Sequence, residues 1–310
     1  MILTAEENFN RLDIFLSEAL EISRSRANDL IKNENIKSDK KLKPSIKVIK
    51  GEKFFVEIPP SENLEILEGE DINFEVVYED ENLLIINKPS GLVVHPAPGN
   101  WKHTLVNGLV YRYPEMKLMN DRLRPGIVHR LDAGTSGLMV VAKNDKTALI
   151  LKEMFKERKV NKEYIALAHG TPKRNEGIIS GSLDRDPDNK IRSVVIEGGK
   201  ASLTGYKVLW SMKNFCLVKF KLFTGRTHQI RAHFSALGCP LLGDKVYGAK
   251  DNFERVFLHS WKLEFNHPIT GDKMKFRQKV TRDFIDFIKT LPPLKRSPFP
   301  FQGRQGSCLP

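Results

Sequence analysis

One carboxylate, that of Asp132, stands in a glycine-rich segment where it could do chemistry. Residues 129–138 read HRLDAGTSGL, so Arg130 precedes the carboxylate by two positions and an apolar run, residues 138–142, follows it. This order predicts an exposed turn that leads into a strand and presents the carboxylate at its tip. An aspartate held in this way could act as a nucleophile or as a base. Ordinary turns use the same residue types, so the segment alone leaves both interpretations open.

The residues around Asp132 argue against several other kinds of site. A P-loop needs Gly-Lys-Ser/Thr at the start of a helix, and no lysine follows these glycines, so we expect no nucleotide cofactor. A glycosidase needs a second carboxyl group, which the segment lacks. The three cysteines form no C-x-x-C pair, which argues against a disulfide framework, a thiolate zinc site and a zinc base deaminase. His228 and His233 would lie on different faces of a helix, so we expect no metal.

Other segments along the chain carry further motifs. They are residues 87–96 (NKPSGLVVHP), 162–166 (KEYIA), 224–233 (TGRTHQIRAH) and 241–248 (LLGDKVYG). Together with residues 129–138 they resemble, in the same order, the signatures of the RluA-type pseudouridine synthases. The resemblance implies an enzyme that isomerises uridine in RNA to pseudouridine and needs no cofactor. Asp184 and Ser260 depart from the family's usual glycine and alanine, and we expect both to lie outside the core of the site.

The resemblance also assigns roles to single residues. Asp132 is the catalytic residue, and C1′, C6 and the C2′ proton all stay open as the first point of attack. Arg130 would fill the space of a flipped-out base, with a structural salt bridge as the alternative. Tyr164 would lie against the uracil ring, although a strand tyrosine alone suggests a core position. Arg226 would pair with the Asp132 carboxylate and keep it ionised and aimed. Ile230 is assigned either to the uracil or to the core.

The charge of the chain predicts a polyanionic partner. The net charge is +12, and residues 83–310 hold 39 basic and 19 acidic residues, whereas residues 1–60 are nearly balanced. We therefore expect the larger segment to grip an RNA backbone. Lys162, on the same strand face as Tyr164, is the RNA-binding candidate there. The resemblance favours 23S ribosomal RNA. Transfer RNA stays an alternative substrate, and a non-catalytic ribosome-assembly factor is the alternative function, although it would predict loss of Asp132 or Arg226.

The first 60 residues predict a small unit of their own. Apolar side chains at helical spacing in residues 10–33 indicate two short helices, the second capped by Ser23. Short strands are expected at residues 36–37 and 53–58. This unit resembles the α-L RNA-binding module of ribosomal and RNA-modifying proteins. The resemblance suggests RNA contacts by Arg24, Arg26 and Lys32, with a solvated charged face as the alternative.

Four segments follow from this pattern. Residues 1–60 form the α-L module, 61–73 an acidic linker expected to stay in solvent, 74–291 the catalytic domain and 292–310 a disordered tail. The catalytic domain should be α+β with a mixed, mainly antiparallel sheet. Strands are expected at residues 74–78, 83–87, 138–142, 164–169, 216–222 and 261–265, and helices at 104–111, 146–157, 227–237 and 283–291. With no signal peptide and no apolar run long enough for a bilayer, we expect no membrane partner and a cytoplasmic monomer.

Overall fold

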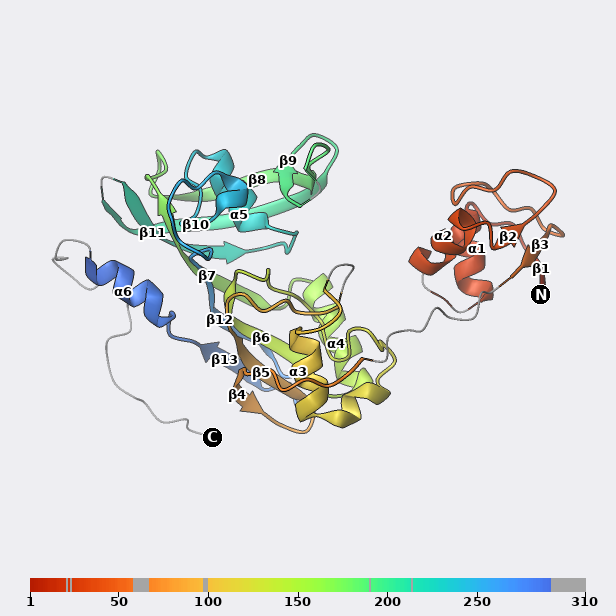
Figure 1. Ribbon diagram of the computed structural model, residues 1–310, viewed down its shortest axis with the longest axis horizontal. Coiled ribbons are helices and arrows are strands. Elements are labelled where there is room, and N and C mark those ends of the chain that lie inside the picture. Colours follow the sequence, from red (N-terminus) through yellow and green to blue (C-terminus); the bar gives the residue numbers. More distant parts are fainter. Residues whose placement is uncertain are drawn as a thin grey trace. The chain divides into compact units, whose positions relative to one another are not determined.

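The chain separates into two compact units, Met1–Ile66 and Leu67–Pro310, which are drawn in Figure 1. The computed structural model describes residues 1–20, 22, 24–57, 67–96, 100–189, 191–212 and 214–290, and of Ser25 and Arg26 it describes the backbone only. The predicted N-cap Ser23, the side chain of Arg26 and the predicted tail at 292–310 therefore lie outside the described residues. In the described part of the chain no helix is both long and apolar enough to cross a membrane.

Two helices and a small sheet make up the first unit. Helices α1 (Leu12–Ala19) and α2 (Arg24–Lys32) accompany strands β1 (Ile2–Thr4), β2 (Ile36–Lys37) and β3 (Lys53–Val56), which pair antiparallel in the order β1-β3-β2. Leu12, Leu16 and Phe54 are fully buried at the centre of its core. Both helices and both strands predicted here are observed, and β1 was not predicted.

A buried carboxylate ties the two helices of this unit together. Asp13 on α1 accepts hydrogen bonds from Arg11 at 2.9 Å and from Arg24 on α2 at 2.8 Å. These bonds, first that from Arg11 and then that from Arg24, lower the pKa of Asp13 to about 2. The guanidinium of Arg24 is therefore partly committed to Asp13, although 56% of its side chain remains exposed.

A ten-stranded sheet forms the second unit. Its order is β4-β5-β6-β12-β7-β11-β10-β8-β9, with β13 paired to β12. The pair β6–β12 is parallel and the other pairs are antiparallel, which confirms the predicted mixed sheet. The strands are β4 Glu75–Glu79, β5 Leu83–Lys88, β6 Ser136–Ala142, β7 Asn161–His169, β8 Glu176–Arg185, β9 Ser193–Val195, β10 Lys200–Met212, β11 Phe215–Leu222, β12 Leu258–Asn266 and β13 Lys273–Arg277.

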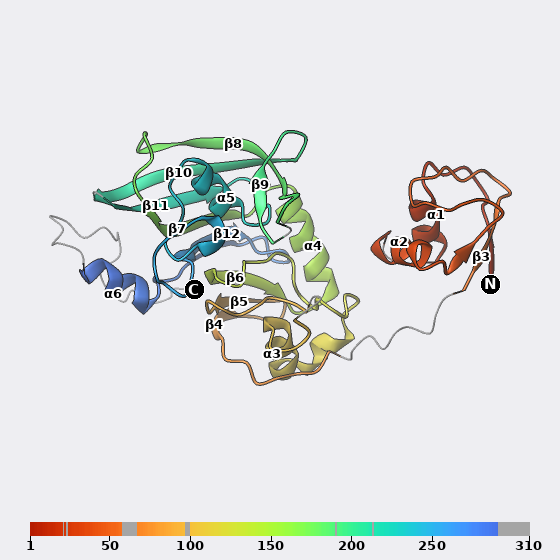
Figure 2. The same ribbon diagram turned by 45° about the horizontal axis from the view of Figure 1, so that its top comes forward.

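The helices of this unit divide between the two halves of the sheet, as Figures 1 and 2 show. Helix α4 lies against β6, and α5 lies against β8, β9 and β10. The elements are α3 Leu105–Arg112, α4 Asp145–Lys156, α5 Gln229–Ala236, α6 Arg282–Thr290 and the short 3-10 helices η1 Pro114–Leu118 and η2 Lys245–Tyr247. Every helix and strand predicted in this unit overlaps an observed one. Strands β8, β9, β10 and β13 were not predicted.

The acidic segment before β4 corrects one expectation. Asn107 of α3 donates to the Glu68 carbonyl at 2.8 Å, and the Glu70 carboxylate accepts the backbone N–H of His103. The packing is close, because a Cβ on Gly69 would lie 2.9 Å from the Cα of Tyr111. The described part of this segment is therefore held against α3 and does not stay in solvent. The Glu70 carboxylate accepts a backbone N–H just before the helix begins, an N-terminal position that favours negative charge.

Strands β6 and β12 come unusually close to one another. Gly137 has a φ of 112°, and a Cβ added there would lie 2.3 Å from the backbone oxygen of Ser260. All seven residues of β6 are buried in the core. Glycine therefore satisfies both the backbone angle and the contact, and it fixes the strand that follows the Asp132 segment.

Candidate active site

Asp132 begins a tight turn that runs directly into the buried strand β6. The N–H of Thr135 donates to the Asp132 carbonyl at 3.0 Å, which closes the turn over residues 132–135, hereafter the Asp132 turn. The Asp132 side chain is 19% exposed. The turn leads into a strand, as the sequence predicted, but the carboxylate at its tip is only partly exposed.

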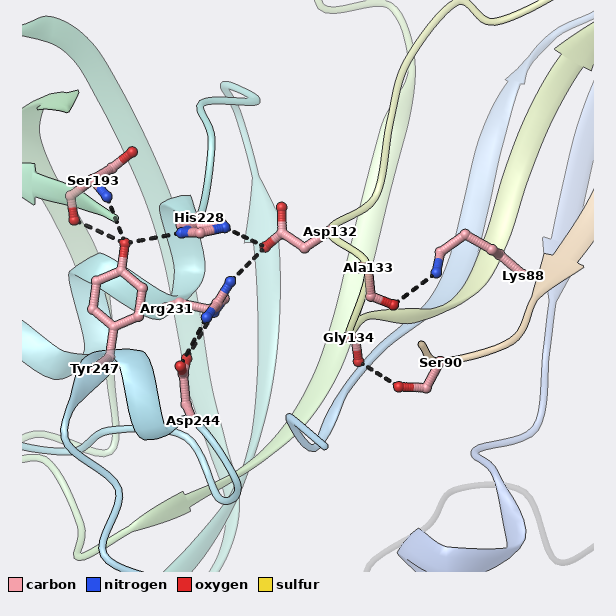
Figure 3. A network of polar contacts seen from close by, with 10 residues as sticks. All are labelled: Lys88, Ser90, Asp132, Ala133, Gly134, Ser193, His228, Arg231, Asp244 and Tyr247. Atoms are coloured by element: carbon pink, nitrogen blue, oxygen red, sulfur yellow. Dashed lines mark hydrogen bonds and ion pairs between the residues drawn. The ribbon is translucent and has the colours of Figure 1, made fainter. Parts of the chain in front are cut away.

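The segment 87–96 holds this turn from one side, as Figure 3 shows. The fully buried Lys88 donates from Nζ to the carbonyls of Pro89, Leu92 and Ala133 at 2.8, 2.8 and 3.0 Å. Ser90 donates from Oγ to the Gly134 carbonyl at 2.8 Å. Burial lowers the pKa of Lys88 to about 7, and the negative charge of Asp132 acts in the opposite direction. The lysine of this motif therefore anchors the Asp132 turn.

His129, three residues before Asp132, is bonded to strand β6 and packs on helix α4. Its Nε2 accepts the backbone N–H of Val140 at 3.0 Å, and its ring stacks on Phe155 of α4 with centroids 4.5 Å apart. Burial, and then the charge of Lys162, lower the pKa of His129 to about 3. The ring is therefore neutral at physiological pH and serves as an acceptor for strand β6.

The ion pairs of the Asp132 carboxylate correct the sequence assignment. Arg231 of α5 places Nη1 3.4 Å from Oδ2 of Asp132, and Nε2 of His228 lies 3.9 Å from the same oxygen. Arg231 also donates to Asp244 from Nε at 2.7 Å and from Nη2 at 2.8 Å. Arg226, predicted to make this pair, donates instead to the Ala201 carbonyl at 3.3 Å. The partner of Asp132 in this structure is Arg231, not Arg226.

The loop before α5 explains why Arg226 points elsewhere. Oε1 of Gln229 accepts from the Arg226 backbone N–H at 3.0 Å and from Oγ1 of Thr224 at 2.7 Å, while Nε2 of Gln229 donates to Thr204 of β10. The helix itself begins only at Gln229, after His228 in a left-handed conformation. Arg226 therefore belongs to the loop, whereas Arg231 lies in the first turn of the helix beneath Asp132.

A cavity of about 800 Å³ opens beside Asp132. Among the described residues that line it, Asp132 is the single acidic one. Tyr164 and Ile230 also line it, and both are buried, with exposed fractions of 5% and 3%. The basic residues that line the cavity are Arg130, Lys156, Arg158, Lys159, Lys162, Lys221, Arg226 and Arg231. The structure thus brings Asp132, Arg130, Tyr164, Lys162, Arg226 and Ile230 to one cavity, as expected.

Tyr164 lies on β7, opposite Ser260 of β12. Burial raises the pKa of Tyr164, the charge of Asp132 raises it further, and a hydrogen bond with Ser260 lowers it. Tyr164 therefore stays a neutral phenol within the electrostatic reach of Asp132. Ser260, which donates to the Leu138 carbonyl at 3.0 Å, was expected outside the core of the site. Ser260 is not among the described residues that line the cavity, which agrees with that expectation, although it contacts the lining residue Tyr164.

Two of the cations, Lys162 and Arg130, contact different neighbours. Lys162 has its Nζ 5.3 Å from the centre of the Phe155 ring, and burial lowers its pKa to about 8. Arg130 is exposed, and its Nη1 lies 3.4 Å from Nε2 of His95. The structural salt bridge considered for Arg130 is not observed among the described residues. Both side chains line the cavity and can offer positive charge to a ligand there.

The arrangement of these residues suits a reaction in which one carboxylate acts on a polyanionic substrate. The described residues contain no group of three or more His, Cys, Asp or Glu side chains placed to hold a metal ion. Asp132 is held by Arg231, which keeps its carboxylate in one orientation, and the cations around the cavity can bind phosphate oxygens. The lack of a second carboxylate among the lining residues does not fit the two-carboxylate mechanism of glycosidases.

Several residues of the site were not singled out from the sequence. Lys88 and Asp244 lay in motifs whose roles were left open, and His228 was considered only as a metal ligand. Asp244 is fully buried and Arg231 is 7% exposed. A charged residue is rarely buried without a partner of opposite charge. Arg231 and Asp244 belong to two different motifs, and the burial of both was the signal that could have paired them.

The chain is similar to proteins that modify RNA. The family model described as RNA pseudouridylate synthase matches residues 82–236. An uncharacterised RNA pseudouridine synthase of Aquifex aeolicus is 40% identical over 289 residues, which cover 88% of this chain and 91% of the relative. Ribosomal large subunit pseudouridine synthase D of Borreliella burgdorferi is 37% identical over 300 residues, which cover 92% and 90%. The structure of human RNA pseudouridylate synthase domain containing 4 has a TM-score of 0.55 at 26% identity and covers 69% of this chain and 91% of that chain.

Proposed function

Because this chain belongs to the RNA pseudouridylate synthase family, we propose that it converts specific uridines of large-subunit ribosomal RNA to pseudouridine, with Asp132 as the catalytic carboxylate. The observation that carries this proposal is the cavity in which, among the described lining residues, Asp132 is the single acidic side chain beside eight Lys and Arg side chains. A polyanionic substrate would be drawn to such a cavity, and its reacting sugar would meet one carboxylate.

The reaction breaks the bond between C1′ and N1, turns the uracil, and joins C5 to C1′. N1 gains a proton and C5 loses one, so nothing is oxidised and no group is added. The site must therefore hold the loosened uracil and keep water out while Asp132 acts on the nucleoside. Tyr164 and Ile230, both buried in the cavity wall, supply apolar surface for the ring. Because its phenol is neutral, Tyr164 can take up the C5 proton only while it gives its own proton to another group, so we assign to it the relay of this proton.

The target base reaches this cavity only after it leaves the RNA stack. Flipping costs a few kcal/mol, and contacts with the RNA must offset it. Arg130 is exposed two residues before Asp132, and its planar guanidinium can stack in the vacated space and bind phosphate together. Lys162 and Arg226 line the same cavity from β7 and from the loop before α5, where they would hold phosphates next to the flipped nucleotide.

The choice of ribosomal RNA is supported by relatives named ribosomal large subunit pseudouridine synthase D, which match more than nine tenths of this chain at 35–39% identity. We assign residues 1–60 to RNA binding as an α-L module. We also propose that the enzyme acts in the cytoplasm, where its ribosomal RNA substrate would be. Lys32 is exposed at the end of α2, and Arg24 is exposed beside Asp13. These side chains, with Arg26, are our candidates for phosphate contacts outside the active site.

The first experiment measures tritium release from RNA labelled at uridine C5. The wild-type chain should release tritium from 23S ribosomal RNA, whereas Asp132→Asn should lose roughly 10²–10⁴-fold in rate while it binds the same RNA with similar affinity. Asp272→Asn is the matched control, because Asp272 is exposed in the β12–β13 turn and bonds Thr270. Equal rates for Asp132→Asn and the wild type would remove Asp132 from the reaction.

The second experiment separates the possible substrates. Pseudouridines are mapped in total RNA from cells that have or lack this protein. Loss of a modified position in 23S ribosomal RNA supports the proposal. Loss confined to transfer RNA would keep the chemistry and replace the substrate, and an unchanged map together with no release in vitro would refute the proposed activity.

A further inference from the structure

The LLGDKVYG motif at residues 241–248 has no role in the function proposed above, yet it supplies two residues behind Asp132. Asp244 holds Arg231, as described, and Tyr247 lies 3.3 Å from Nδ1 of His228. Figure 3 shows both branches converging on the Asp132 carboxylate. The second branch, from Tyr247 through His228, carries the inference.

Backbone groups of β9 fix the position of the Tyr247 hydroxyl. The N–H of Ser193 donates to this oxygen at 2.8 Å, and the hydroxyl can donate to the Ser193 carbonyl at 2.8 Å. Tyr247 is 7% exposed, and burial raises its pKa to about 12. The phenol is therefore neutral at physiological pH, and its one proton has two acceptors to choose from, the Ser193 carbonyl and the His228 ring.

His228 occupies an unusual backbone conformation for a residue with a side chain. It has φ 55° and ψ 22° and precedes the first residue of α5. A left-handed conformation outside glycine costs free energy and is found preferentially at functional sites. Here it turns the ring between the Tyr247 hydroxyl and Oδ2 of Asp132, with 15% of the side chain exposed.

The two tautomers of a neutral His228 are not equivalent in this position. A proton on Nδ1 would point at Tyr247 and leave the lone pair of Nε2 facing a carboxylate. A proton on Nε2 points at Oδ2 of Asp132, and Nδ1 then accepts the Tyr247 proton. Burial, which is the largest effect, lowers the pKa of His228, so the neutral ring is the relevant form.

We propose that His228 is a positioning residue for Asp132: Tyr247 holds it in the Nε2–H tautomer, and it donates toward Oδ2 beside Arg231. Both groups contact Oδ2, and in the described part of the chain Oδ1 accepts no hydrogen bond. Oδ1 is then the oxygen presented to the nucleoside. The contact of 3.9 Å is longer than a hydrogen bond, and such contacts commonly tighten once substrate fills a site. This inference rests on the proposed function of Asp132.

The test compares four variants of the full chain in single-turnover tritium release with saturating enzyme. His228→Ala should lower the rate at least about tenfold with RNA affinity unchanged within twofold. His228→Gln should recover a large part of it, because the glutamine amide can place an N–H near the Nε2 position. Tyr247→Phe should give an intermediate loss. Tyr113→Phe is the matched control, since its hydroxyl bonds Glu79 at 2.8 Å, away from the cavity.

A second readout does not depend on turnover. Nitrogen-15 NMR of the eight histidines, with the His228 signal identified by its absence in His228→Gln, should show a protonated Nε2 in the wild type and a mixture of tautomers in Tyr247→Phe. A wild-type Nδ1–H tautomer overturns the proposal. Equal rates for His228→Ala and wild type, or equal loss in His228→Ala and His228→Gln, also overturn it. A wild type without any tritium release would instead refute the proposed function, and the tautomer measurement would still decide the role of His228.

Discussion

Replacement of Asp244 by asparagine should disturb the site without touching the substrate. Asp244 accepts from Arg231 at 2.7 and 2.8 Å, and the two side chains are 1% and 8% exposed. Asparagine keeps the shape and one acceptor oxygen, but it removes the charge that balances the buried guanidinium. Arg231 would then have Asp132 as its remaining carboxylate, and its Nη1 would no longer be aimed by a fixed pair.

The expected loss of stability follows from the burial of the Arg231–Asp244 ion pair. Removal of one partner of a buried ion pair costs about 3–5 kcal/mol, and the surviving hydrogen bond places Asp244→Asn near the lower end, at about 3 kcal/mol. In a unit of this size, that corresponds to a fall of roughly 6–12 °C in the unfolding temperature. A displacement of about 1 Å at a reacting group can cost about 100-fold in rate, so we expect the single-turnover rate to fall by roughly 10- to 100-fold.

Tryptophan fluorescence during unfolding gives the stability, because Trp101, Trp210 and Trp261 all lie in the larger unit. The rate comes from tritium release at a temperature where both proteins are folded. Asp80→Asn is the control, since Asp80 accepts two backbone N–H groups and pairs with His267 far along the sheet. It should lose stability and keep its rate. An Asp244→Asn protein that loses stability but turns over like the wild type would refute the idea that the Arg231 geometry matters for Asp132.

Three further perturbations test other parts of the structure. Burial lowers the pKa of Lys162 to about 8, so RNA affinity measured by filter binding should fall by up to about tenfold per pH unit above pH 8. The variant Lys162→Arg should abolish this fall. Parallel pH profiles of RNA affinity for the wild type and Lys162→Arg would contradict this role of Lys162. Gly137→Ala should destabilise the larger unit by about 3 kcal/mol or more, because the new Cβ would meet the Ser260 oxygen, and unchanged urea unfolding would show otherwise. The pKa of Asp13 is lowered to about 2 in the folded state, so its stabilising contribution is present above about pH 4 and is lost as the pH falls toward 2. Amide-exchange protection of α1 and α2 should show this loss in wild type but not in Asp13→Asn.

The sequence predicted the elements that are strongly apolar or clearly periodic. Strand β6 is a continuous apolar run and α4 has a regular stripe, and both are observed where expected. Strands β8 and β10 were missed because most of their residues are half-buried or exposed, without a continuous apolar run, and because they contain Gly177, Gly181 and Gly205. Their position is set by pairing with each other and with β11, which local sequence does not reveal. The docking of residues 67–72 on α3 depends in the same way on a partner distant in the chain.

The residues that line the cavity were easier to predict than the ion pairs between them. A sequence motif indicates which residues gather around a substrate. The motifs predicted that Asp132, Arg130 and Tyr164 share one site, and all three line the cavity. The motifs do not say which of two arginines meets the carboxylate. Arg226 and Arg231 flank the start of the same helix, and the choice between them depends on a left-handed residue and on the bonds of Gln229.

Helix α5 shows why the choice between Arg226 and Arg231 could not be made from the spacing of apolar residues. A surface helix reveals its inner face by an apolar stripe, and in this segment such a stripe would consist of Ile230, Phe234 and Leu237. Leu237 is instead 43% exposed, while the first six residues of α5 are all buried on every side. In a helix enclosed in this way, a charged residue cannot face solvent, so Arg231 had to find carboxylates within the fold. Arg231 has two carboxylate partners. The buried one, Asp244, accepts from Nε and Nη2 and sets the direction of the side chain, which leaves Nη1 for Asp132.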